Sequence, residues 1–373
     1  MGFYMTNVNH LINMTISAGG IGTVYSMRET TSPKSILQYI INFFTFGGER
    51  RNNEAQYALL VESMAEALSK STSGVDGIPE KLMINNINGC SISFTRPEES
   101  NDSGYVNIEV RDGVYCESAQ ISTDIYERVC RTLLFRSEFN IPQHAIVLTD
   151  NGGMYLKGAN LEKVNLFERD LSYADLSFSN ISYAQMTLAN LSHANLENSN
   201  LSEATLFMAI LHDANLDGAM LSGAEMGQAN MAKSSLKKAN LFGAFLSDAI
   251  LCDANLEKAT LSNVDMVGAD LSNSNLKAAT LSGANMTRAK LVNADLCASV
   301  LFATNLTDSD LTNAGLENTD LSYSNFTGAD LSRAVLSKAK MFGSTVGDVI
   351  IENTVMDKKT RIFFSKQSDK YNF

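Results

Sequence analysis

Histidine and cysteine are the side chains best suited to hold a metal ion or to act as nucleophiles, and both are sparse in this chain. The four histidines are His10, His144, His193 and His212. The five cysteines are Cys90, Cys116, Cys130, Cys252 and Cys297. The two sets share no ligand spacing, so we expect no metal site. Cysteines that are odd in number and scattered are typical of reduced thiols rather than of a disulfide framework.

No nucleophile stands in a recognisable relation to a general base. We therefore expect no catalytic residues, no cofactor-binding residues and no bound cofactor, and we predict that the protein is not an enzyme. An enzymatic role confined to the N-terminal part of the chain is the catalytic alternative that remains open.

Composition narrows the remaining functions. The 373 residues carry a net charge of −12, and 45% of them are hydrophobic while 19% are charged. A sizeable core is possible and wholesale disorder is not expected. Such an acidic chain lacks the broad basic surface of a nucleic-acid-binding protein. The best apolar stretch, Ile36 to Phe46, has about half the length of a membrane-spanning helix, and the N-terminus does not resemble a Sec signal peptide.

A period of five residues dominates the second half of the chain. From Leu156 to Met356 every fifth residue is apolar, and 30 of these 41 central positions are leucine. Two residues before each centre, between 159 and 339, alanine or serine occupies 32 of 37 positions. The residue directly before the centre is usually Asn or Asp. This period fits neither an α-helix nor an ordinary strand.

The pattern predicts a chain that turns a corner every five residues, so that four units make a square coil. Each leucine fills the interior of one side, and the small residue fits where the wall approaches the axis. Stacked coils would pair their backbones at the spacing of β-strands. Residues 151–356 then form about ten coils, and Cys252 and Cys297, which follow centres, should point outward.

The first 150 residues are organised differently. Residues 1–31 are rich in Ser, Thr, Asn and Gly and are expected to be mobile, whereas 32–150 are predicted to form a small α+β domain that covers the first coil. Residues 357–373 would cap the other end. The helices are predicted near 33–46, 53–68 and 124–135, and the strands near 82–87, 91–95, 105–111 and 114–121.

The helix that begins at Pro33 has a broad apolar side made by Ile36, Leu37, Ile40, Phe43 and Phe44. Two interpretations fit such a side. It packs inside the N-terminal domain, which is the commoner case, or it lies on a membrane surface.

The repeats are the pentapeptide-repeat signature, and this resemblance covers residues 156–356. That family folds as a right-handed quadrilateral β-helix, so the expected fold class is mainly β, preceded by the α+β domain. The N-terminal stretches are similar to the PipB-type effectors, which are pentapeptide-repeat proteins of Salmonella-like bacteria. The matching stretches are Ser32-Pro33-Lys34-Ser35-Ile36-Leu37, Asn42-Phe43-Phe44-Thr45, Gly47-Gly48 with Arg50-Arg51, Asn88-Gly89-Cys90, Val129-Cys130-Arg131, and Leu148-Thr149 to Gly152-Gly153.

The resemblance implies a non-enzymatic effector that type III secretion injects into host cells, with the flexible residues 1–31 as its secretion and translocation signal. It implies action in the host cytosol and on vacuolar or late-endosomal membranes, with host proteins, the host endomembrane surface and the secretion apparatus as partners and without nucleic acid. One branch of the family recruits a kinesin motor through its C-terminal region, which makes kinesin-type machinery a further implied partner. The last residues, Ser365 to Phe373, show no motif that matches this activity.

The outward positions of the coil offer one candidate partner-binding face. Stacked neighbours differ by twenty residues, so Phe242, Phe302 and Phe342 should lie on one side, with Tyr183 and Tyr323 along it. Serine occupies most of the other positions that are equivalent to the three phenylalanines in the twenty-residue repeat. Exposed aromatic side chains on a rigid surface are candidate partner anchors. The alternative is that they merely stack on neighbouring coils.

A second function from another class remains open. Other pentapeptide-repeat proteins mimic DNA and bind topoisomerases, and an acidic rod suits that role. Against it, 13 basic residues are interspersed with 22 acidic ones over residues 151–356, which breaks up a continuous negative field.

Overall fold

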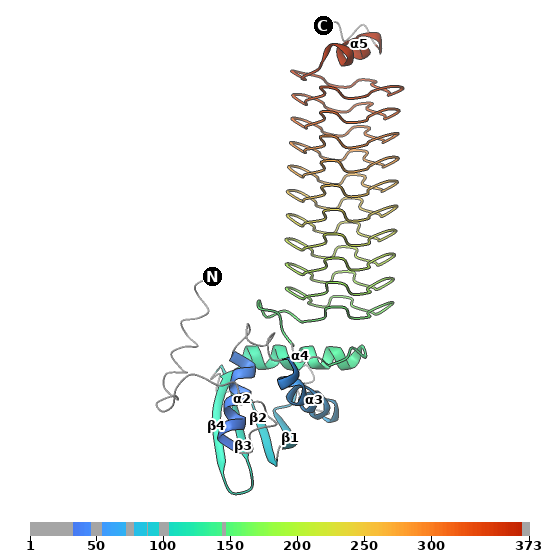
Figure 1. The fold of residues 1–373 in the computed structure, drawn as a ribbon. Coiled ribbons are helices and arrows are strands. Elements are labelled where there is room, and N and C mark those ends of the chain that lie inside the picture. Colours follow the sequence, from blue (N-terminus) through green and yellow to red (C-terminus); the bar gives the residue numbers. More distant parts are fainter. Residues whose placement is uncertain are drawn as a thin grey trace. The chain divides into compact units, whose positions relative to one another are not determined.

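The computed structural model describes residues 33–45, 54–71, 78–87, 89–96, 104–143 and 147–367 (Figure 1). The chain divides into two compact units, Met1–Gly152 and Gly153–Phe373. The predicted mobile segment 1–31 lies outside the described residues, as do His144 and most of the tail after Ser365.

In its described residues, the N-terminal unit combines a four-stranded antiparallel sheet, ordered β1-β2-β3-β4, with three helices. Helices α2 and α3 precede the sheet and α4 follows it, and α2 packs on β3 and β4 while α3 packs on β1 and α4. The elements are α2 (Pro33–Thr45), α3 (Glu54–Lys70), β1 (Lys81–Ile87), β2 (Cys90–Thr95), β3 (Tyr105–Arg111), β4 (Cys116–Ser122) and α4 (Thr123–Glu138). The predicted order of helices and strands is confirmed.

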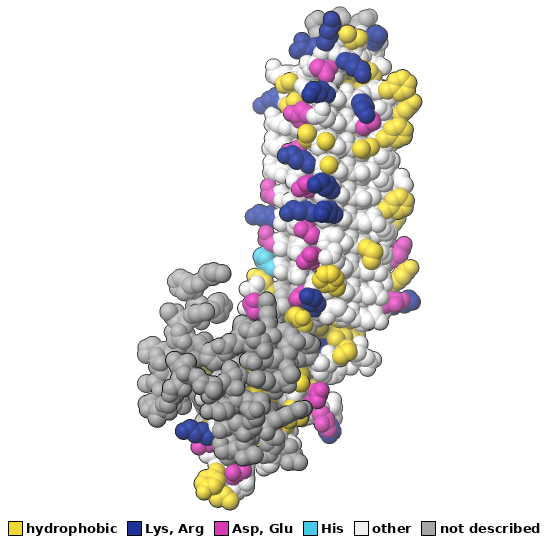
Figure 2. Space-filling view, viewed as in Figure 1, with side chains coloured by type: hydrophobic (Ala, Val, Ile, Leu, Met, Phe, Trp, Pro, Cys, Tyr) yellow, Lys and Arg dark blue, Asp and Glu magenta, His cyan; other side chains and the backbone are white. Residues whose placement is uncertain are grey.

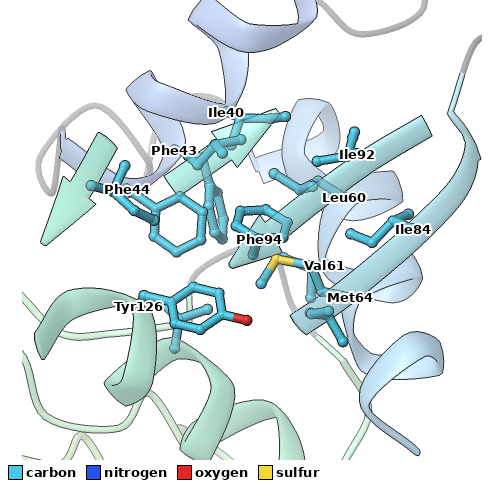
Figure 3. Close-up of a cluster of buried hydrophobic side chains, with 14 of the residues drawn as sticks. Ile40, Phe43, Phe44, Leu60, Val61, Met64, Ile84, Ile92, Phe94 and Tyr126 are labelled. Carbon is cyan, nitrogen blue, oxygen red and sulfur yellow. The ribbon is translucent and has the colours of Figure 1, made fainter. Parts of the chain in front are cut away.

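The core of this unit lies between the helices and the sheet (Figure 3). The ring of Phe94 on β2 stacks on Tyr126 of α4 with 5.4 Å between centroids, and Phe44 of α2 meets Phe94 edge-on at 5.9 Å. Ile40 and Phe43 of α2 are completely buried. The apolar side of this helix therefore packs in the core, and the membrane-surface interpretation of that side is wrong.

The start of β4 differs from the prediction. The strand was expected from Val114 but begins at Cys116, because Val114 and Tyr115 belong to the hairpin turn. Asp112 Oδ1 accepts hydrogen bonds from the N–H groups of both residues, at 3.3 and 2.9 Å. Gly113 has φ +94°, which a side chain would disfavour.

The second unit is a coil with a strict repeat of twenty residues. Parallel bridges join each residue that precedes a centre to the residue twenty further on, from Tyr155–Asp175 to Val335–Val355. The predicted four-sided coil of five-residue sides is confirmed. Leu161 and Leu256 are completely buried, as are the alanines two residues before most centres, for example Ala174. Each buried leucine contributes about 1.5–3 kcal/mol of transfer free energy.

The residue before each centre fixes the corner that follows. Its side-chain oxygen accepts a hydrogen bond from the N–H two residues on, as between Asn190 and Ser192 at 3.1 Å. The same side chains bond to the next coil: Asn200 Nδ2 donates to Asn180 Oδ1 at 3.1 Å. These two bonds explain the preference for Asn and Asp, since an apolar residue there leaves corner N–H groups without a side-chain acceptor.

The outward corner residue, two after each centre, adopts a left-handed conformation. Non-glycine residues at these corners have φ between 53° and 63°. This conformation costs an ordinary residue about 1–2 kcal/mol. From Lys163 to Arg333 the corner N–H groups donate to the following coil, as Tyr183 N does to Ser202 O at 3.0 Å, so neighbouring coils hold these strained corners in place.

Helix α5 (Lys358–Gln367) follows the last coil (Figure 1). Asp357 accepts hydrogen bonds from Thr360 N at 2.9 Å and from Lys338 N at 2.7 Å, which ties the helix start to the coil. Phe364, which lies in the segment 357–373 that is predicted to cap this end, is fully buried. Among the helices of the described ranges, none has both the length and the apolar character needed to cross a membrane.

Candidate partner-binding surface

The structure places all five predicted face residues on the outside of the coil. Their exposed fractions are 54% for Tyr183, 50% for Phe242, 44% for Phe302, 53% for Tyr323 and 72% for Phe342. Hydrophobic side chains gather along one edge of the coil toward its C-terminal end (Figure 2).

Three of the five form a continuous aromatic ladder, namely Phe302, Tyr323 and Phe342. The Phe302 and Tyr323 rings meet edge-on with 5.3 Å between centroids, and Tyr323 meets Phe342 in the same way at 5.4 Å. Tyr323 N also donates to Phe342 O at 2.8 Å. Gly343 leaves room for the central ring, because a Cβ on it would lie 2.7 Å from the ring carbons of Tyr323.

Tyr183 and Phe242 lie apart from the ladder. Serines 262 and 282 occupy the equivalent positions between Phe242 and Phe302. The ring of Tyr183 instead has Lys163 Nζ 5.7 Å from its centroid. The predicted side of the rod therefore divides into one cluster of three aromatic residues and two separate residues.

The ladder has an apolar centre and a polar rim. Val300, 37% exposed, belongs to the same side of the coil. Lys340 Nζ lies 3.4 Å from an oxygen of Asp320. Burial raises the pKa of Asp320, but hydrogen bonds from Ser322 and the Lys340 ammonium outweigh it and hold that pKa below its ordinary value. Asp320 is therefore ionised at neutral pH. An apolar centre with charges at its edge is the usual layout of a protein interface.

Exposure alone does not distinguish the ladder, because other aromatic residues of the rod are also exposed. Phe167, Phe178, Phe207 and Phe245 are between 40% and 56% exposed. Phe302, Tyr323 and Phe342 form an unbroken run of phenylalanine and tyrosine rings along the coil. Contiguity over successive coils is what makes them a candidate surface.

The thiols are poorly placed for chemistry. Cys130 is completely buried in the N-terminal unit, and burial raises its pKa to about 12. Cys252 and Cys297, which were expected to point outward, are half-buried. Burial also raises the pKa of Cys252. Since the thiolate is the reactive form, Cys130 and Cys252 are weak nucleophiles at neutral pH.

Two groups of side chains escaped the sequence analysis. Val114 and Tyr115 at the β3–β4 turn are 85% and 69% exposed. The second group is His193 and His212, which share no ligand spacing with the cysteines. Their rings lie 4.9 Å apart in successive coils. In the sequence, the two histidines are nineteen residues apart, one fewer than a full coil, and this spacing could have predicted that they are neighbours.

The twenty-residue coil places this chain among known proteins. The family model described as pentapeptide repeats (8 copies) matches residues 170–206, 209–248, 239–277, 279–318 and 309–345. HetL of the cyanobacterium Nostoc sp. strain PCC 7120, a pentapeptide-repeat protein involved in heterocyst differentiation regulation, superposes with a TM-score of 0.53 at 32% identity, over 54% of this chain and 90% of HetL. The chain belongs to the pentapeptide-repeat proteins.

The N-terminal unit gives a narrower relationship. Residues 30–136 match the family described as the N-terminal domain of the secreted effector protein PipB2. PipB2 of Salmonella typhimurium is 47% identical over 161 residues, which is 43% of this chain and 46% of PipB2. PipB of the same organism is 33% identical over 147 residues, 39% of this chain and 50% of PipB. The chain thus spans about half the length of the curated relatives it matches, and it is homologous to both.

Proposed function

We propose that the chain is a type III secreted effector that acts in host cells as a rigid, non-enzymatic adaptor at vacuolar or late-endosomal membranes. The observation that carries this proposal is the PipB2-type domain of residues 30–136 ahead of the coil. Pentapeptide repeats occur in proteins of many functions, whereas this domain is described from secreted effectors.

The coil supports an adaptor role for physical reasons. In this proposal the coil of residues 151–356 follows a right-handed path and has about ten turns, as the sequence predicts. Each of its sides is bonded to the coils before and after, as Asn200 N is to Ser179 O at 2.9 Å and Leu201 N to Met220 O at 2.7 Å. A surface held this firmly loses little conformational entropy when a partner binds. Aromatic anchors on it are efficient, because their rings bring large contact area with few rotatable bonds.

Within this proposal the aromatic ladder of Phe302, Tyr323 and Phe342 contacts a host protein, with Phe242 and Tyr183 at the edge of the same face. Kinesin-type motor machinery, implied by the resemblance to one branch of the family, is a specific partner to test. Helix α5 would cap the last coil, and its residue Phe364 is fully buried.

The test is a reporter fusion to the full chain, expressed in a type III-competent strain and in an isogenic strain without the secretion apparatus. We expect reporter signal in host cells only with the competent strain, concentrated on vacuolar or late-endosomal membranes. A fusion to residues 151–373, which lacks the PipB2-type domain, serves as the control for the role of that domain. Equal delivery by both strains would contradict the effector proposal, and uniform cytosolic distribution would contradict the membrane part.

A further inference from the structure

His193, His212 and Asp213 form a cluster of metal-binding atoms on the surface of the coil. Their donor atoms all lie within 4.8 Å of one another. His212 Nδ1 is 3.1 Å from an oxygen of Asp213. His193 and Asp213 are exposed and His212 is half-buried, so solvent and ions reach all three.

The backbone holds these side chains across two successive coils. His193 N donates to His212 O at 3.0 Å, which joins the two coils at the cluster itself, and Asp213 N donates to Ala232 O at 3.0 Å. His193 and Asp213 both occupy the left-handed corner position, each with φ 56°. The geometry is therefore set by the repeat and does not depend on a mobile loop.

A third ring orients the first histidine. The Tyr173 ring, one coil earlier, stacks on His193 with 4.6 Å between centroids and 12° between planes. His193 in turn meets His212 edge-on at 4.9 Å. Stacking restricts the rotation of the His193 imidazole, which lowers the entropy lost on metal binding.

Two imidazole nitrogens and one carboxylate oxygen are a donor set that suits zinc and related divalent transition metals. Tetrahedral zinc with bonds of about 2.0–2.1 Å needs donors about 3.3 Å apart. The His212–Asp213 pair already has this separation, and a small rotation of the exposed His193 side chain closes the rest. Three protein ligands leave a fourth position for water or for a ligand from outside.

We propose that His193, His212 and Asp213 bind one Zn²⁺ ion that bridges two successive coils and keeps one coordination position open. This site is independent of the aromatic ladder. The ladder residues lie two or three residues after positions 300, 320 and 340. The three metal-binding residues lie two or three residues after positions 190 and 210, which is ten residues further round a coil of twenty. Ten residues are half a coil, so the two groups occupy opposite sides.

The repeat itself supplies substitutions that preserve the fold. Asparagine occupies the corner position of His193 in other coils, as at Asn273 and Asn313, and serine occupies the position of His212, as at Ser272. His193→Asn, His212→Ser and Asp213→Asn therefore remove ligands without introducing residues foreign to the frame. Asp253→Asn is the matched control, since Asp253 lies at the same corner two coils on, with φ 59°.

The experiment is a calorimetric titration of Zn²⁺ into untagged full-length protein that has first been treated with a chelator. Co²⁺ absorbance is a second readout, because it reports the coordination geometry. We expect one saturable Zn²⁺ site, a loss of affinity of more than about tenfold for His193→Asn and for His212→Ser, and unchanged binding for Asp253→Asn. Unchanged far-UV circular dichroism of each variant verifies the fold.

The double variant His193→Asn/His212→Ser decides the matter, since the other histidines and the cysteines can also take up zinc. If the double variant binds Zn²⁺ as tightly and with the same stoichiometry as the parent chain, the proposal is wrong. It is equally wrong if the parent chain shows no saturable site.

Discussion

Replacing Tyr323 with asparagine tests whether the aromatic ladder is a cohesive unit. Tyr323 makes two ring contacts, at 5.3 and 5.4 Å, and an aromatic pair contributes about 0.5–1.5 kcal/mol. Losing both should lower the free energy of unfolding by about 1–3 kcal/mol. The assay is urea unfolding followed by far-UV circular dichroism. Tyr323→Asn is compared with the parent chain, and the unfolding free energy of both proteins should depend on urea concentration with the same slope.

Tyr183→Asn is the control because it makes the same chemical change at the same position of the coil. The two residues have φ 62° and 58°, so any relief of left-handed strain by asparagine cancels in the comparison. Tyr183 loses only the contact with Lys163 Nζ at 5.7 Å, worth about 0.5–1 kcal/mol at an exposed site. Tyr323→Asn should therefore be the more destabilising of the two.

A double-mutant cycle between Tyr323→Asn and Phe302→Ser isolates the ring contact. We expect a coupling energy of about 0.5–1.5 kcal/mol. A coupling near zero, together with equal effects of Tyr323→Asn and Tyr183→Asn, would refute the reasoning. The rings would then be neighbours without cohesion, and the ladder would not be a preformed surface.

The remaining predictions concern partner capture, the core and the alternative function. Replacing Phe242, Phe302 and Phe342 together with serine should weaken capture of host proteins by the purified chain; unchanged capture would argue against the face. Leu256→Ala, at a fully buried centre, should lower the free energy of unfolding by about 3–5 kcal/mol, and a loss below about 1 kcal/mol would contradict close packing of the interior. The chain should leave gyrase supercoiling unaffected, because ion pairs such as Lys277–Asp295 at 2.8 Å interrupt its negative surface, and inhibition at stoichiometric concentration would favour a DNA mimic.

The sequence predicted the coil well, because a strict period of five gives each position one environment. The leucine and alanine columns are buried as expected, since the interior accepts only those sizes. In the N-terminal unit, β3 was predicted with its bounds because Val106, Ile108 and Val110 alternate with polar residues. The start of β4 was missed because the side chain of Asp112 extends the turn over two apolar residues.

The sites on the surface were harder to predict, because they depend on contacts between coils. Phe302 and Tyr323 are separated by 21 residues, and His193 and His212 by 19. Neither pair occupies one column, so each contact depends on how far corner side chains lean along the coil axis. The period of the sequence determines where a residue lies around the coil, but it does not determine how far its side chain tilts along the coil axis. The prediction therefore found the ladder residues as members of one side and missed the histidine pair.

The two clusters show how a coil of this kind can carry separate activities. Interior positions are fixed by packing, whereas most residues one and two after each centre are partly or fully exposed. Each such cluster depends on two or three coils, and distant coils of a repeat protein contribute nearly independently to stability. Changes at His193 should therefore leave the ladder intact, and changes at Tyr323 should leave zinc binding intact. One chain can then test the adaptor face and the metal site separately, each variant serving as a folded control for the other.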